Sequence, residues 1–254
     1  MNNTRLHCIL SVEEISRLIS IGADVNHQDC DGGTALHVSR SSAVVRTLVE
    51  HGACVHRKNN RGMSPLHRAR NVGVAAALLE HGAPVNSLDN HENTPLHYAN
   101  DAQVVRVLLM HGGNPGARNS AGETPIHRSI YLSKVLALVN AGADVDAADN
   151  EGRTLLMRQS RCFFVTNMLR GITALYPSDR VRDAGGRTAV DFAEWDGVKH
   201  FLLEYRKRHN WFRRRGLVIL REKNKHGVKA VGDTVVCRVL CVPEGVFRSI
   251  VGYL

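Results

Sequence analysis

Apolar residues recur along this chain in a pattern that predicts amphipathic helices. In the middle of the chain, Val104 and Val105 are followed by Leu108 and Leu109. Positions i, i+1, i+4 and i+5 lie on one face of an α-helix, so this segment predicts a helix that buries one side. Gly112 is expected to end the helix, because glycine readily adopts the left-handed conformation that follows many helices. The same pattern occurs 60 residues earlier, as Val44, Val45, Leu48 and Val49.

A four-residue phrase precedes each of these helices and returns at a fixed interval. It reads TRLH, TALH, SPLH, TPLH, TPIH and TLLM in copies that begin at positions 4, 34, 64, 94, 124 and 154. A seventh copy, TAVD, begins at 188 after a longer spacing. A fixed period of about 20 to 50 residues is typical of a solenoid. Each unit of a solenoid buries its apolar face against its neighbours, and the array presents an extended surface rather than a reaction pocket.

The unit that begins at Thr94 predicts a short first helix before the amphipathic one. Thr94 can cap a helix with its hydroxyl, and Pro95 fits the first helical position, where a missing N–H has no cost. Leu96 and Ala99 are expected to face inward, and the small Ala99 lets neighbouring units approach closely.

An extended, turn-rich connector follows each amphipathic helix. It holds Asp or Asn five residues before the next phrase and, in most units, a turn glycine three residues later, as in Asp149 and Gly152. Glu92 stands where that glycine is expected. We therefore predict a different backbone shape for the turn at Glu92.

These motifs resemble the ankyrin repeat over about residues 4–205. The resemblance includes the TPLH phrase, the paired apolar positions and GADVN-like segments that begin at positions 22, 52, 82 and 142. It implies an all-α ankyrin-repeat solenoid of helix-turn-helix units with hairpin-like connectors. We predict about seven units in residues 1–205, starting near 4, 34, 64, 94, 124, 154 and 188, and a basic helical cap in residues 206–254.

The unit length departs from that family. An ankyrin unit usually has about 33 residues, whereas these units have 30. The three missing residues fall between the two helices. Either the first helix is shorter than usual or the two helices are joined more tightly.

Composition argues against an enzyme or a membrane protein. The chain of 254 residues is 43% hydrophobic and 22% charged, as expected of a globular protein. No run of 18 apolar residues occurs, and neither a phosphate-binding loop nor a nucleophilic triad is evident. We expect no catalytic residues and no cofactor. The six cysteines are irregularly spaced, which favours free thiols and an intracellular location, cytoplasmic or nuclear.

Most of the 14 histidines fall into two ladders. The first occupies the last position of the phrase: His7, His37, His67, His97 and His127. Packed helices lie about 8–10 Å apart, whereas metal ligands converge at about 2 Å from one ion. We therefore predict a structural role and no metal site, and the resemblance implies bonds to the threonine and to connector backbone. A second ladder, expected to stabilise helix C-termini, comprises His51, His81 and His111.

Variable positions on the predicted stack are the candidates for partner binding. Four residues after the phrase begins stand Arg68, Tyr98, Arg128 and Arg158, here called the Arg/Tyr stripe. Arginine and tyrosine often carry binding energy at interfaces. The predicted connector tips add Arg61, Met63, His91, Asn93, Glu123 and Arg153. Either these residues contact a protein target, or the arginines merely solvate a helix face.

A basic segment follows the repeats. Residues 206–229 contain ten Lys or Arg and one acid, which equals the net charge of +9. One interpretation is a nuclear address or a contact with nucleic acid. The other is an amphipathic cap for the end of the stack, with Trp211 and Phe212 packed inward.

The final residues, VPEGVFRSIVGYL at 242–254, resemble the opening of an F-box. The matching positions are Pro243, Val246, Phe247, Ile250 and Leu254. The resemblance implies recruitment of the adaptor of a cullin ubiquitin ligase. Val242 and Gly245 depart from the F-box pattern, and an ordinary amphipathic helix is the alternative.

Together these features predict a protein-interaction scaffold that binds a protein target and that acts through its tail as a ubiquitin ligase adaptor. The alternative is a nuclear or nucleic-acid-associated factor that uses residues 206–229.

Overall fold

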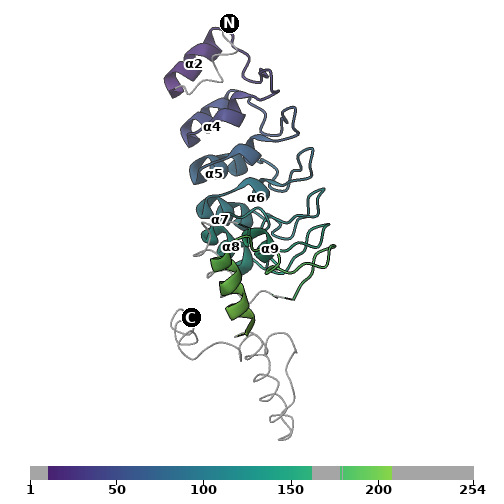
Figure 1. The fold of residues 1–254 in the computed structure, drawn as a ribbon. Helices are drawn as coiled ribbons and strands as arrows, with labels where there is room; N and C mark the ends of the chain where they lie inside the picture. The colour runs from purple at the N-terminus through teal and green to yellow at the C-terminus, as the bar shows by residue number, and fades with distance from the viewer. Residues whose placement is uncertain (1–10, 162–177, 179, 208–254) are drawn as a thin grey trace, which may run out of the picture. The chain divides into compact units, whose positions relative to one another are not determined.

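The computed structural model describes residues 11–161, 178 and 180–207 (Figure 1). The first copy of the phrase and the tail from residue 208, with its F-box-like positions, lie outside the described residues. The chain divides into two compact units, residues 1–192 and 193–254. The predicted extent of the repeats, to residue 205, stays a prediction.

A row of parallel helices forms the body of the first unit. Five helices of nine residues begin at intervals of 30 residues, and each contacts the next along the chain. They are α2 (Val12–Ser20), α4 (Ser42–Glu50), α5 (Val72–Glu80), α7 (Ala102–Met110) and α8 (Leu132–Asn140). Their apolar residues form the core as the periodicity predicts: Val45, Leu48, Val105 and Leu108 are at most 1% exposed.

The first helix of each unit is only about one turn long. These helices are α3 (Ala35–Val38), η1 (Pro65–Arg68), α6 (Pro95–Tyr98) and α9 (Leu155–Gln159), and residues 125–128 form turns in the same place. Ala99, at the end of α6, is already extended, with φ −62° and ψ 121°. The 30-residue unit therefore arises from a shortened first helix, one of the two alternatives that the sequence left open.

The connectors lie beside one another along one side of the helices (Figure 1). Each tip turn is held by its Asp or Asn; Asp89 Oδ1, for example, accepts from the backbone N–H groups of His91 and Asn93 at 2.8 Å. Successive connectors are joined by backbone bonds of 3.0 Å, from Asn90 to Arg61, from Ser120 to His91 and from Asn150 to Ala121. The described residues contain helices and turns but no strand.

The prediction for the turn at Glu92 is wrong. Glu92 has φ 62°, close to the 74° of Gly62 and the 73° of Gly122. Its N–H donates to Asp89 O at 3.0 Å, as Gly62 N–H does to Asn59 O at 2.8 Å. Bonds to both neighbouring connectors hold the turn in the common shape, so Glu92 adopts a left-handed conformation that costs a non-glycine residue about 1–2 kcal/mol.

In the second unit, a helix covers residues 196–207 and buries Val198 and Leu202. No helix in the described part of the chain has the length and apolar character needed to cross a membrane.

Candidate functional site

The first histidine ladder joins each unit to the next. In the unit of α6, His97 Nδ1 accepts from the backbone N–H of Thr94 at 3.1 Å and lies 3.0 Å from Thr94 Oγ1. Its Nε2 donates to the carbonyl oxygen of Glu123, in the next connector, at 3.0 Å. The same bonds recur from His37 to Met63, from His67 to Asn93 and from His127 to Arg153. The structural role predicted for these side chains is confirmed.

Burial keeps the ladder neutral. It lowers the pKa of His67 and His127, and it lowers the pKa of His97 to about 4. Because the carbonyl can only accept, Nε2 must carry the proton and Nδ1 must be free to accept. No cluster in the described residues has three or more side chains that could hold a metal ion.

Two members of the second ladder bond to the helix that they follow. His51 Nδ1 lies 2.8 Å from Thr47 O, and His111 Nδ1 lies 2.9 Å from Val107 O. Each carbonyl also accepts the backbone N–H of its own histidine at 3.2 Å, so the imidazole adds a second donor at the end of the helix.

Most of the Arg/Tyr stripe is engaged in contacts within the protein. Tyr98 donates its hydroxyl to Asp89 Oδ2 at 2.6 Å. The guanidinium of Arg128 lies over the Tyr98 ring, 5.3 Å from its centroid, within range of a cation–π interaction. The structure therefore brings the stripe together as a connected row from α6 onward.

Glu123 binds the two later arginines of the stripe. Its carboxylate lies 3.7 Å from Arg128 Nη1 and forms a hydrogen-bonded ion pair with Arg158 Nη1. Partial burial acts to raise the pKa of Glu123, but the hydrogen bond and charge of Arg158 outweigh it and hold the pKa below its usual range. Asp149 adds a second acid, 3.9 Å from Arg158 and 2.9 Å from Arg153 Nε. These ion pairs balance the arginine charges within the protein and so stabilise this part of its surface.

The interpretation of Met63 and Asn93 as exposed tip residues is wrong. Met63 is 8% exposed and Asn93 is 1% exposed. The amide of Asn93 donates to Asp89 and accepts from Asn119 Nδ2 at 2.9 Å. The position directly before the phrase returns from the tip toward the helices, so its side chain points into the stack. Glu123 occupies the same position, and its side chain is only 12% exposed.

The remaining predicted residues reach solvent. Arg61, Arg68, Arg128 and His91 are exposed, whereas Tyr98, Arg153 and Arg158 are half-buried. The residues predicted to bind a partner therefore include some that face solvent and others that support them from beneath.

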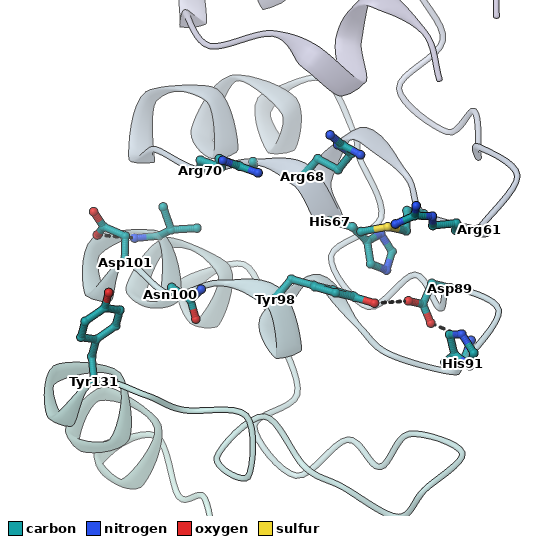
Figure 2. A pocket seen from close by; sticks show the side chains of 13 residues that line it. Arg61, His67, Arg68, Arg70, Asp89, His91, Tyr98, Asn100, Asp101 and Tyr131 are labelled. Carbon is teal, nitrogen blue, oxygen red and sulfur yellow. Dashed lines mark hydrogen bonds between the residues drawn. The ribbon is translucent and has the colours of Figure 1, made fainter. Parts of the chain in front are cut away.

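A groove of about 1200 Å³ opens on this face between η1 and the following units. Figure 2 shows Arg61, Arg68 and Arg70 in a row across it from Asn100, and Tyr131 beyond Asp101. Sequence analysis did not select Arg70, Asn100, Asp101 or Tyr131. Arg70 and Asn100 stand two positions after Arg68 and Tyr98, and this repeated spacing could have identified them in the sequence.

A buried lysine, Lys134 of α8, lies beside the stripe. Its side chain is 0% exposed, and Nζ donates to His97 O at 3.1 Å. Burial, together with the nearby charge of Arg128, lowers the pKa of Lys134 to about 7. Lys134 takes the place that Val74 and Val104 occupy 60 and 30 residues earlier, so the substitution is visible in the sequence.

Comparison with protein-family models identifies ankyrin repeats in two overlapping segments, three copies over residues 6–89 and many copies over residues 78–128. A comparison with curated proteins gave no significant match. The unit that begins at 124 continues the same geometry, since the His127–Arg153 bond repeats that of His97 and Glu123. The chain therefore contains a solenoid of ankyrin repeats.

Proposed function

We propose that this protein is an interaction scaffold that binds a protein target through the face of the stack that carries the Arg/Tyr stripe. The observation that carries the proposal is the groove, where exposed Arg61 and Arg68 lie near Tyr98 and Tyr131. Arginine and tyrosine are enriched among residues that dominate binding energy.

Proximity labelling of the full chain tests this function. The wild type is compared with the double variant Arg68→Glu/Arg70→Glu and with Arg106→Glu, an exposed arginine of α7 outside the groove. Proteins labelled by the wild type and by Arg106→Glu, but not by the double variant, are candidate targets. Direct binding of the purified candidate must show the same dependence, and a target set that is identical for all three chains would contradict the proposal.

A finer proposal concerns the tail. The F-box-like positions Pro243, Val246, Phe247, Ile250 and Leu254 support the idea that the scaffold recruits the adaptor of a cullin ubiquitin ligase. Deletion of residues 242–254 should remove adaptor binding and leave target binding intact. A lower melting temperature with no adaptor bound to either chain would instead identify the segment as a structural cap.

The basic composition of residues 206–229 favours a second candidate function, association with nucleic acid in the nucleus. The two candidates differ in their response to salt. Binding to phosphates weakens steeply as salt concentration rises, whereas binding through the groove should weaken less. Both functions place the protein inside the cell, in the cytoplasm or the nucleus.

A further inference from the structure

Three arginines at the groove have no counter-charge among the residues that the structure describes. Arg61, Arg68 and Arg70 are all exposed, and the described residues offer no ion pair to any of their guanidinium groups. Two acids also line the groove, and both are already engaged. Asp89 holds the hydroxyl of Tyr98, and Asp101 caps α7 by accepting from the backbone of Gln103 and Val104.

The repeat makes an internal comparison available, because Arg68, Arg128 and Arg158 occupy equivalent positions. Arg128 finds Glu123 directly before its own phrase, and Arg158 finds the same residue before the preceding phrase. Arg158 also has Asp149, five residues before its own phrase.

Arg68 has no acid at any of these three places. The residue before its own phrase is Met63, the one before the preceding phrase is Gly33, and the one five residues before its own phrase is Asn59. The stack thus neutralises its later arginines and leaves Arg68 free to pair with a carboxylate from outside. Arg61 and Arg70 place two further cations beside it.

The groove also offers aromatic surface between its charges. Tyr131 is 55% exposed. The ring of Tyr98 is braced on one side by His67, with ring centroids 6.0 Å apart, and its hydroxyl is fixed by Asp89. Rigid tyrosines provide contact area at low entropic cost.

We propose that this groove binds an acidic segment of the partner protein, with Asp or Glu side chains paired to Arg68, Arg70 and Arg61 and with intervening residues packed on Tyr98 and Tyr131. Guanidinium groups match carboxylates in bidentate geometry. Asp89 and Asp101 would repel a continuous phosphate backbone, whereas a peptide can place its acids only opposite the arginines. This inference rests on the proposed function and specifies the chemistry of its target.

A labelled peptide tests the inference on the full chain. The probe is a short glutamate-rich peptide that contains tyrosine, a fluorophore and a photo-crosslinker; the matched peptide has glutamine in place of each glutamate. We expect the glutamate peptide to bind at least about tenfold more tightly, and its crosslinks to map to the groove. Arg68→Gln/Arg70→Gln should weaken binding by about tenfold or more, because it removes two charge-assisted pairs with the glutamates.

The exposed Arg106 supplies the matched control, because Arg106→Gln removes a charge outside the groove. Equal binding of the two peptides, equal loss in both variants or crosslinks confined to residues 208–254 would overturn the inference. So would a single-stranded oligonucleotide that displaces the peptide from the groove. If a target identified by proximity labelling needs Arg68 but binds through a segment without acids, the proposed function stands and this inference alone fails.

Discussion

His97 Nε2 donates a hydrogen bond to the carbonyl oxygen of Glu123 at 3.0 Å, while the carboxylate of Glu123 binds Arg128 and Arg158. The backbone of Glu123 thus accepts the hydrogen bond that joins two repeats, and its side chain neutralises two arginines of the Arg/Tyr stripe. The stability of the stack and the charge of its surface are therefore linked at the same position.

Acid should weaken the stack before its carboxylates are protonated. The folded pKa of His97 is about 4, below the 6.5 of a free imidazole, so the folded state resists protonation. The contribution of neutral His97 to the free energy of unfolding is fully present above pH about 6.5. It is lost as the pH falls toward about 4, and a pKa shift of this size corresponds to about 3 kcal/mol.

Chemical denaturation across this pH range measures the effect. His97→Gln should lower stability at neutral pH and flatten the pH dependence. The carboxylates of Glu123 and Asp149 have lowered pKa values, so their contribution to stability begins to be lost only at the acid end of this range, as the carboxylates of the unfolded chain become protonated. If the free energy of unfolding of the wild type is constant from pH about 7 to about 4, the folded state does not hold His97 neutral as inferred.

Lys134→Met should stabilise the protein at neutral pH. Because burial lowers the pKa of Lys134 from 10.5 to about 7, the folded state disfavours the charged amine that the unfolded state prefers. The wild type should lose stability as the pH falls from about 10.5 to about 7, and the variant should lack this dependence. Replacing buried charges with apolar side chains often adds about 1–4 kcal/mol.

Denaturant unfolding at pH about 8 and about 10 compares the two chains. The gain from Lys134→Met should be larger at the lower pH. A variant that is less stable at both values would show that the bond from Nζ to His97 O outweighs the cost of burial.

Glu92→Gly should stabilise the third connector, which follows α5. Glycine removes the left-handed strain at φ 62° but adds entropy to the unfolded chain, so the net gain is about 0.5–1 kcal/mol. Glu92→Ala is the control, because alanine keeps a Cβ and should give no such gain. The melting temperatures of wild type, Glu92→Gly and Glu92→Ala measure the effect. Equal melting temperatures for the glycine and alanine variants would exclude backbone strain as the cause.

The assignment of core and surface gives a further prediction. Leu108 is 1% exposed, so Leu108→Ala should cost about 2–5 kcal/mol by leaving a cavity. Arg61 is exposed, and Arg61→Ala should cost less than about 0.5 kcal/mol. Denaturant unfolding of both variants measures the difference, and similar losses would refute the assignment.

The sequence predicts the features that depend on local pattern. The 30-residue period, the buried positions of α7 and the role of His97 follow from spacing and from the resemblance to ankyrin repeats. The burial of Asn93 does not follow from the sequence pattern, because it depends on how the connector turns back toward the helices. The conformation of Glu92 follows from bonds to neighbouring connectors, which no single unit encodes.

The pairing of charges across the stack could not be read from one unit either. Arg68, Arg128 and Arg158 look equivalent in the sequence. Their surroundings differ because Arg128 and Arg158 pair with acids that stand before their own or the preceding phrase, whereas Arg68 has no acid at these places. The distinction between an arginine that stabilises the surface and one that is open to a partner therefore requires the structure.

The most direct test of the account is the affinity of the identified target for the purified full chain, measured by calorimetry with wild type, Arg68→Glu/Arg70→Glu and Arg106→Glu. All three chains should melt at similar temperatures. The account predicts that the double variant raises the Kd by more than about tenfold, a loss above about 1.4 kcal/mol, while Arg106→Glu leaves the Kd within about twofold of wild type. A Kd that is unchanged in the double variant would contradict binding at the groove.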